Sequence, residues 1–103
     1  MSLAGKLLRE FTAKIRGRGF AYFHANKVEI LDHSESHVDA KVRGSEDYLV
    51  RLTLGRVSLD VACTCPYFED GEACKHIWAT MLAADSRQYL TDASMVTRLS
   101  PGS

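Results

Sequence analysis

Three cysteines and one histidine lie within fourteen residues of this chain, in the pattern Cys-x-Cys, eight residues, Cys-x-His. They are Cys63, Cys65, Cys74 and His76, and the chain has no other cysteine. Thiolate sulfur and imidazole nitrogen suit Zn²⁺, and four such ligands complete its tetrahedral shell. The pattern therefore predicts one closed, structural Cys3His zinc site.

Three other uses of these cysteines are less consistent with the pattern. A redox Cys-x-Cys pair would leave Cys74 and His76 without a role. A disulfide would leave one cysteine over, and the chain shows no charged segment followed by an apolar one that would direct it to an oxidising compartment. A catalytic zinc ion keeps one position open, whereas four strong ligands are present here.

Net charge is zero, but the charges are unevenly distributed along the chain. The first 27 residues hold six basic residues and one acidic residue, whereas the rest hold seven basic and twelve acidic ones. A polyanion such as nucleic acid should therefore meet the N-terminal segment. We expect the contacts to come from Lys6, Arg9, Arg16 and Arg18.

The loop between Cys65 and Cys74 has a different character. It is acidic, which argues against phosphate binding at this loop. Its two aromatic residues could either seal the core or stack on a base. The residues in question are Tyr67, Phe68, Glu69, Asp70 and Glu72.

Residues 3–16 are predicted to form an amphipathic helix. At about 100° per residue the apolar side chains fall within one arc and the basic ones lie opposite. The apolar set is Ala4, Leu7, Leu8, Phe11 and Ile15. Gly17 and Gly19 are expected to end the helix. We expect its apolar stripe to pack on a sheet rather than on a membrane surface.

Residues 27–63 contain short runs in which apolar and polar residues alternate, as in antiparallel strands. Turns are expected at 32–35, at 44–47 and at Gly55-Arg56. The last run carries Val57, Leu59 and Val61, and its alternation continues into Cys63 and Cys65. Both thiolates should therefore project on the same side as the hydrophobic core.

A second helix is expected from about Cys74 to Ala84, with Trp78 in the core behind the metal. Residues two apart on a regular helix point in nearly opposite directions. Cys74 should therefore precede the first turn, and His76 should lean back toward the helix N-terminus to reach the ion. Residues 86–103 lose apolar periodicity and are expected to form a tail.

These segments predict an α+β fold. It would consist of a small antiparallel sheet of about four strands, an N-terminal amphipathic helix, and a C-terminal helix after the Cys3His zinc site. Residues 1–85 would form a single zinc-binding domain, with the helix at 3–16, the strands at 27–63 and the finger at 63–85. Residues 86–103 would be the tail.

The segment from Cys63 to Ala79 resembles the SWIM zinc finger, whose pattern is Cys-x-Cys, a variable gap, Cys-x-His. The Cys-Pro that follows the first pair and the Cys-Lys-His that precedes an apolar helix match this family closely. The stretch upstream, with Gly19-Phe20-Ala21-Tyr22-Phe23, is similar to the region before the finger in bacterial members. All four ligand positions match, so the resemblance implies one structural Zn²⁺.

The resemblance also implies a function. Members of the family occur beside Swi/Snf-type ATPases, in Mutator-type transposases and in ubiquitin-pathway proteins, as modules that bind DNA or protein. The chain contains no Gly-x-x-x-x-Gly-Lys-Ser/Thr loop for ATP. We therefore expect an N-terminal accessory domain of a bacterial Swi/Snf-type ATPase, with the motor elsewhere on the same polypeptide or on a partner.

Two functional classes remain open. The first is a non-catalytic accessory domain that binds nucleic acid, in the cytoplasm and at the nucleoid of a bacterium. The second is an adaptor that binds another protein without contacting DNA, which zero net charge and the acidic loop favour. An enzyme is not expected, because the pattern offers neither an open metal position nor a nucleophile with its base. We expect no small-molecule substrate and no membrane partner.

Overall fold

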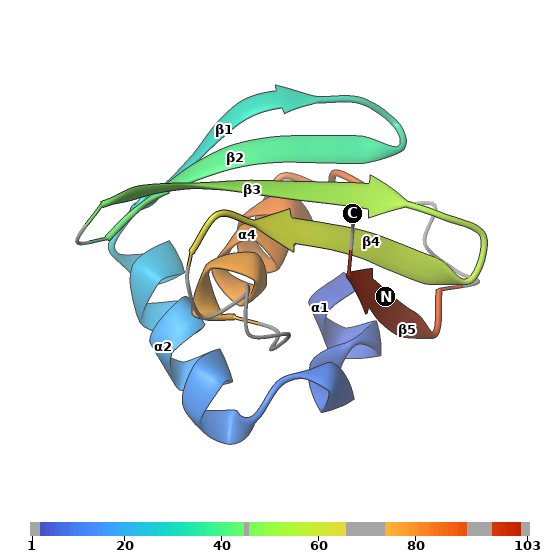
Figure 1. Cartoon of the computed structure of the whole chain (residues 1–103), viewed down its shortest axis with the longest axis horizontal. Coiled ribbons are helices and arrows are strands. Elements are labelled where there is room, and N and C mark those ends of the chain that lie inside the picture. The colour runs from blue at the N-terminus through green and yellow to red at the C-terminus, as the bar shows by residue number, and fades with distance from the viewer. Residues whose placement is uncertain (1–2, 45, 66–73, 91–95, 102–103) are drawn as a thin grey trace.

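A five-stranded sheet carries helices on one of its faces (Figure 1). The computed structural model describes residues 3–44, 46–65, 74–90 and 96–101. In chain order the elements are α1 (Leu3–Lys6), the 3-10 helix η1 (Leu8–Glu10), α2 (Ala13–His24), β1 (Val28–His33), β2 (His37–Arg43), β3 (Asp47–Leu54), β4 (Ser58–Cys63), α4 (Lys75–Ser86) and β5 (Arg98–Pro101). The α+β class is confirmed.

Strands β1 to β4 form the antiparallel meander that the alternating pattern predicts. Inward-facing residues such as Val42 and Leu52 are fully buried, while their neighbours along each strand are more exposed. Val57 is an exception, because it lies before β4 begins and is 44% exposed. The predicted alternation therefore holds from Leu59 onward.

Strand β5 was not predicted. Residues 98–101 pair in parallel with β4, in the register Leu59↔Leu99, and extend the sheet to the order β1-β2-β3-β4-β5. Leu90 and Val96, from the same predicted tail, are buried. A parallel pair needs a long crossover, which α4 provides here. Four residues with one apolar side chain inward carry too little periodicity to reveal such a strand.

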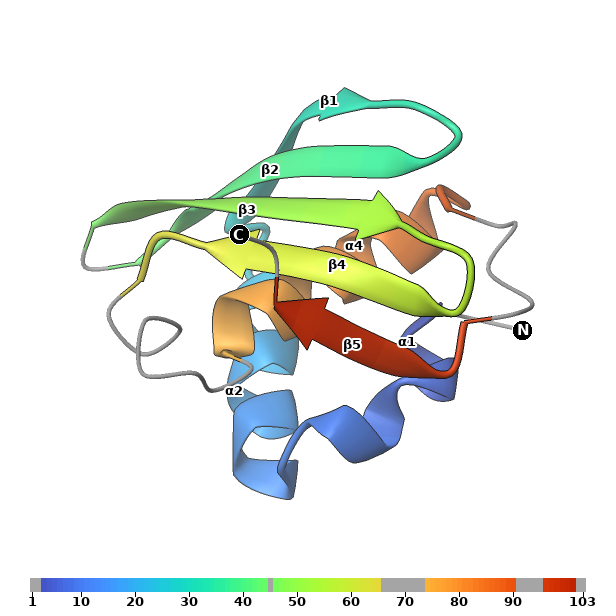
Figure 2. The ribbon, with the colours of Figure 1, turned by 45° about the vertical axis from the view of Figure 1, so that its right-hand side comes forward.

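Helix α4 lies between the sheet and the N-terminal helices (Figure 2). Eight of its residues are buried, on every side of the helix, as expected for a helix enclosed by protein. Trp78 contacts the Phe11 ring with 4.9 Å between centroids, and its predicted place in the core is confirmed. None of the helices in the described ranges has the length and apolar character that a membrane crossing requires.

The single helix predicted at 3–16 is wrong. The chain turns sharply at Phe11 and Thr12, which have extended backbone angles, and this separates α1 and η1 from α2. Thr12 caps α2 by accepting a hydrogen bond from the Ile15 N–H through its Oγ1 at 3.2 Å. Threonine is a common N-cap, and this was the missed signal. Because of the break, Leu8 is 41% exposed rather than buried.

Glycine does not end the first long helix either. Gly17 and Gly19 lie inside α2, which continues to His24 and is followed by Asn26 with φ of 59°. A Cβ on Gly19 would come within 2.7 Å of both the Lys75 carbonyl oxygen and Trp78 Cδ1. Gly19 therefore allows α2 to approach α4 closely.

Helix α4 also holds the start of the chain. The Asp85 carboxylate accepts hydrogen bonds from the backbone N–H of Leu3 at 2.7 Å and of Ala4 at 2.8 Å. Farther along, Glu10 Oε1 accepts from the Leu99 N–H at 3.0 Å. These contacts link residues more than eighty positions apart and join α1, η1, α4 and β5 into one unit.

Gly19 and Gly17 make a matched pair for testing the helix contact. Gly19→Ala should lower the free energy of unfolding by about 1–3 kcal/mol, because the added methyl overpacks against Trp78 and Lys75. Gly17→Ala should raise it by about 0.5–1 kcal/mol, because nothing lies within 4 Å of that Cβ position and alanine favours helix. Urea unfolding of both variants measures the difference, and equal effects would contradict the close approach.

Candidate metal centre

Strand β4 delivers the first two ligands. Cys63 is its last residue, and the chain beyond it stays in line with β3 through two further hydrogen bonds. The Thr64 N–H donates to the Leu49 carbonyl at 3.1 Å, and the Leu49 N–H donates to Thr64 Oγ1 at 3.0 Å. Strand alternation then turns Cys63 and Cys65 to the inner face, where both are buried, as predicted.

Helix α4 delivers the other two ligands. Cys74 is its N-cap, with the extended backbone angles φ −98° and ψ 166°, and His76 lies in the first turn. The predicted arrangement, with Cys74 just before the helix, is therefore confirmed. Both side chains are at least nine-tenths buried.

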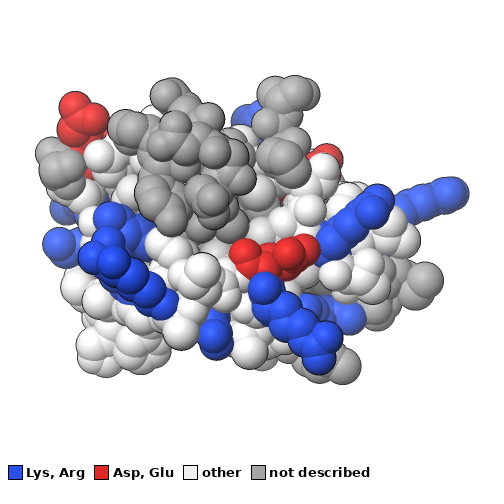
Figure 3. Space-filling view, turned by 60° about the horizontal axis from the view of Figure 1, so that its bottom comes forward, with Lys and Arg blue, Asp and Glu red and all other residues white. Residues whose placement is uncertain are grey.

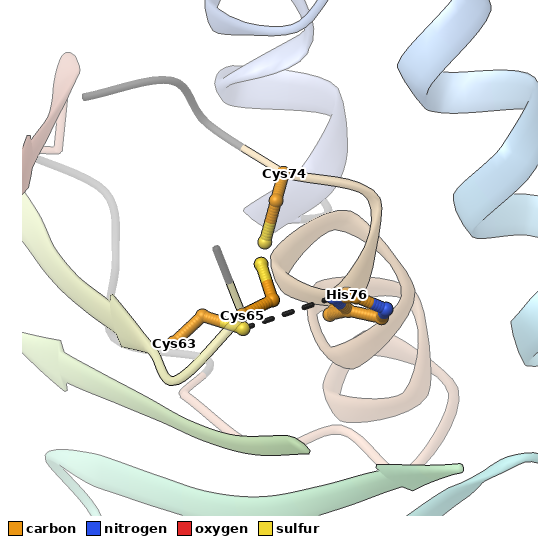
Figure 4. Close-up of side chains that lie close together, drawn as sticks. All are labelled: Cys63, Cys65, Cys74 and His76. Atoms are coloured by element: carbon orange, nitrogen blue, oxygen red, sulfur yellow. Dashed lines mark hydrogen bonds between the residues drawn. The ribbon is translucent and has the colours of Figure 1, made fainter. Parts of the chain in front are cut away.

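The four side chains converge on one point between β4 and α4 (Figure 4). Their ligand atoms all lie within 4.8 Å of one another, and Cys63 Sγ is 3.8 Å from His76 Nδ1. A tetrahedral zinc ion with bonds of about 2.3 Å holds neighbouring sulfur ligands about 3.8 Å apart. All three cysteines are free thiols. The donor atoms and their spacing therefore fit one structural Zn²⁺.

The thiols are electrostatically coupled to one another. Cys63 hydrogen-bonds to Cys74, and this bond lowers the pKa of Cys74 to about 4, against the opposing effect of burial. The same bond and burial raise the pKa of Cys63. Without a cation, Cys74 is thus the thiol that ionises, and Cys63 keeps its proton and donates it in their hydrogen bond. A divalent cation would allow the remaining thiols to lose their protons as well.

Two tyrosine rings hold the imidazole of His76. Tyr48 stacks on it at 4.5 Å between centroids with 29° between the planes, and Tyr22 lies at 5.4 Å on a tilted plane. Nδ1 faces Cys63, whereas the buried Nε2 has no hydrogen-bond partner in the described part of the chain. Nδ1 is therefore the ligand atom, and Nε2 carries the proton. The alternation of Tyr48 with Val50 and Leu52 indicates an inward position for Tyr48, whereas no such pattern indicates Tyr22.

A second group of side chains that could bind a metal ion lies on the outer face of the sheet. Atoms of Asp32, His37 and Asp39 come within 4.8 Å of one another, but these residues are exposed or half-buried. Arg51 donates to Asp39 at 2.7 Å and 3.1 Å, and its positive charge opposes a cation there. We therefore assign no metal to this group.

The basic residues predicted to contact nucleic acid are divided among three elements. Lys6 ends α1, Arg9 lies in η1, and Arg16 and Arg18 lie in α2. Lys75 is not among these predicted contacts; it lies between two zinc ligands, with its Nζ 5.7 Å from the Tyr22 ring centroid. Lys27 lies over the same ring at 5.5 Å. The acidic and aromatic loop residues 67–72 lie outside the described residues.

Zinc content should depend on the four buried ligands alone. The purified chain should carry about one equivalent, and Cys74→Ser or His76→Ala should lose it together with much of the fold. Structural zinc contributes on the order of 10 kcal/mol in finger peptides, comparable to the whole stability of a small domain. Elemental analysis and thermal melting, with and without a chelator, measure both effects.

His37→Ala is the matched control, because it removes a histidine from the exposed Asp32–His37–Asp39 group. Zinc content and melting temperature should stay close to those of the unaltered chain. Full zinc occupancy in the Cys74→Ser, His76→Ala double variant would refute the assignment.

Comparison with known proteins agrees with this geometry. The family model described as the SWIM zinc finger matches residues 48–85, a segment that includes strand β3, all four ligands and most of α4. No curated protein and no solved structure matches the chain. The chain therefore carries a zinc finger of the SWIM family over residues 48–85.

Proposed function

We propose that this zinc module binds nucleic acid as a non-catalytic accessory domain, through a basic surface centred on α2. The observation that carries the proposal is the charge of this helix. Residues 11–28 contain four basic residues, Lys14, Arg16, Arg18 and Lys27, and no acidic residue. A surface segment whose charged side chains are all positive attracts phosphate and raises the association rate of a polyanion.

Within the described ranges, no carboxylate is paired with a cation of α2. None of the ion pairs found among the described residues involves Lys14, Arg16 or Arg18. Lys and Arg side chains gather in two groups on the helix side of the molecule, one toward α2 and one toward α1, and carboxylates lie beside the second (Figure 3). The α2 group is therefore the stronger candidate for phosphate contacts.

Zinc supports this surface by holding the start of α4 against α2. Lys75 lies between the ligands Cys74 and His76, and Arg18 and Lys75 line the same hollow beside the metal centre. The positive end of the α4 dipole points to the same region. The metal would thus fix the position of Lys75 beside Arg18.

A closed site with four protein ligands has no free coordination position for a substrate or an activated water. The zinc ion would therefore act through structure and not through chemistry. By its resemblance to modules found beside Swi/Snf-type ATPases, the chain would work with such a motor on the same polypeptide or on a partner.

A protein adaptor is the second candidate, and one observation favours it. The outer face of the sheet exposes Leu31 and Leu49, at 50% and 53%, around a hollow that Asp39, Arg51 and Ala62 also line. Apolar side chains beside a paired Asp and Arg suit a protein surface better than a phosphate backbone. This face lies opposite the helices, so the two candidates use different sides of the molecule.

Salt-dependent DNA binding tests the proposal. With about three phosphates neutralised, log affinity should fall with log salt at a slope near −3. Arg16→Ala with Arg18→Ala should weaken binding to all sequences and reduce that slope by about 2. Fluorescence anisotropy on unrelated duplexes, with zinc content and melting temperature as checks on folding, measures this.

Arg43→Ala with Arg51→Ala is the control, because it removes the same charge from residues that are ion-paired with Glu29 and Asp39. Exposed pairs of this kind contribute about 0–1 kcal/mol, so the fold should survive. Equal loss of affinity in both double variants would contradict a site on α2. Absence of binding at about 50 mM salt would favour the adaptor.

A further inference from the structure

The outer face of α2 exposes an aromatic ring. Phe20 is 54% exposed, the most of any large apolar side chain in the part of the chain that the structure describes. The opposite face of the helix, with Ile15 and Gly19, is buried toward α4. In both ribbon views α2 is the outermost helix at its end of the molecule, and no drawn element covers its outer side (Figures 1 and 2).

The surroundings of Phe20 leave about half of its surface open to solvent. The His24 ring lies one turn on, 5.7 Å away between centroids and within 14° of parallel. Gly17, one turn back, has nothing within 4 Å of its Cβ position. Phe20 and His24 therefore form a stacked pair of exposed rings beside bare backbone at Gly17, and we name these three residues the Phe20 platform.

Cations flank this platform. Arg16 precedes Phe20 by four residues and so lies beside it on the helix, while Lys14 lies on the other flank, next to Gly17. The occupant should therefore be anionic and carry flat apolar groups.

We propose that the Phe20 platform stacks unpaired bases, so that this surface prefers single-stranded nucleic acid to duplex. The proposal rests on the proposed function and goes beyond it in naming the form of the ligand. Single strands offer free base faces next to phosphates, which matches a ring platform bordered by Arg and Lys. In a duplex the bases already stack on each other, and only the phosphates would be used.

Other occupants fit the same surface less well. A second copy of the chain would bring the cations of one α2 against those of the other. A lipid surface calls for a broad apolar helix face, whereas Phe20 is the single strongly exposed large apolar side chain of α2 among the described residues. An acidic peptide would satisfy the cations but would leave the ring platform without a specific partner.

Anisotropy of the zinc-loaded full chain tests the proposal with a labelled dT oligonucleotide of about twelve nucleotides and a duplex of similar length. The single strand should bind more tightly at equal salt. Phe20→Ala should weaken single-strand binding about 5- to 100-fold, without changing the salt slope, because it removes stacking and no charge. Phe20→Trp should retain binding.

Leu49→Ala is the matched control, since Leu49 is 53% exposed but lies on the outer face of the sheet. It should leave both affinities unchanged, and melting temperatures should show that Phe20→Ala remains folded. Equal binding of single strand and duplex, or indifference to Phe20→Ala, would overturn the preference. If the Arg16→Ala, Arg18→Ala variant still lost affinity in that case, nucleic-acid binding through α2 would be supported and the preference for single strands would be refuted. If neither form bound at about 50 mM salt, both would fail.

Displacement gives an independent result. Unlabelled poly-glutamate carries the negative charge without bases, so it should compete only weakly for the unaltered chain. Competition as strong as that of unlabelled dT oligonucleotide, and equally sensitive to Phe20→Ala, would assign the platform to an acidic peptide instead.

Discussion

Four buried donor atoms link the end of β4 to the first turn of α4, and the rest of the structure depends on this link. Two ligands, Cys63 and Cys65, lie at the end of the strand, and the other two lie at the start of the helix. A single ion bound by all four would therefore join these two elements. Burial and the shared hydrogen bond raise the pKa of Cys63 and lower that of Cys74, and a divalent cation would allow the thiols to lose their protons together.

Helix α4, whose first turn would be fixed by the ion, contacts both the sheet and the N-terminal helices. It is buried all round, between the sheet and the N-terminal helices, and it provides the crossover that lets β5 pair in parallel with β4. Asp85 at its far end holds the first residues of the chain, and Trp78 meets Gly19 of α2. The position of α2, and with it the basic surface, is thus set by the helix that the metal anchors.

The two faces of the molecule differ in chemistry. On the helix side, α2 combines cations that have no carboxylate partners among the described residues with an exposed aromatic ring. On the outer face of the sheet, Arg43 and Arg51 are paired with carboxylates, and Leu31 and Leu49 are exposed. The proposed partner is therefore a polyanion for the first face and a protein for the second, because unpaired charge attracts phosphate while neutralised charge does not. A structural zinc ion is compatible with either function, because it would stabilise the fold that presents both faces.

The metal ligands, the antiparallel meander and the position of Cys74 before its helix could all be predicted from the sequence, because spacing and local alternation determine them. The break at Thr12 has a local signal in its N-cap, whereas the continuation of α2 through Gly17 and Gly19 and strand β5 could not be predicted. They depend on contacts between residues far apart in the chain: Gly19 with Trp78, Asp85 with Leu3, and Leu99 with Glu10. The sequence by itself determined the chemistry of the metal site. Only the tertiary structure decided which basic and aromatic side chains share a surface, because that depends on which helix faces pack inward.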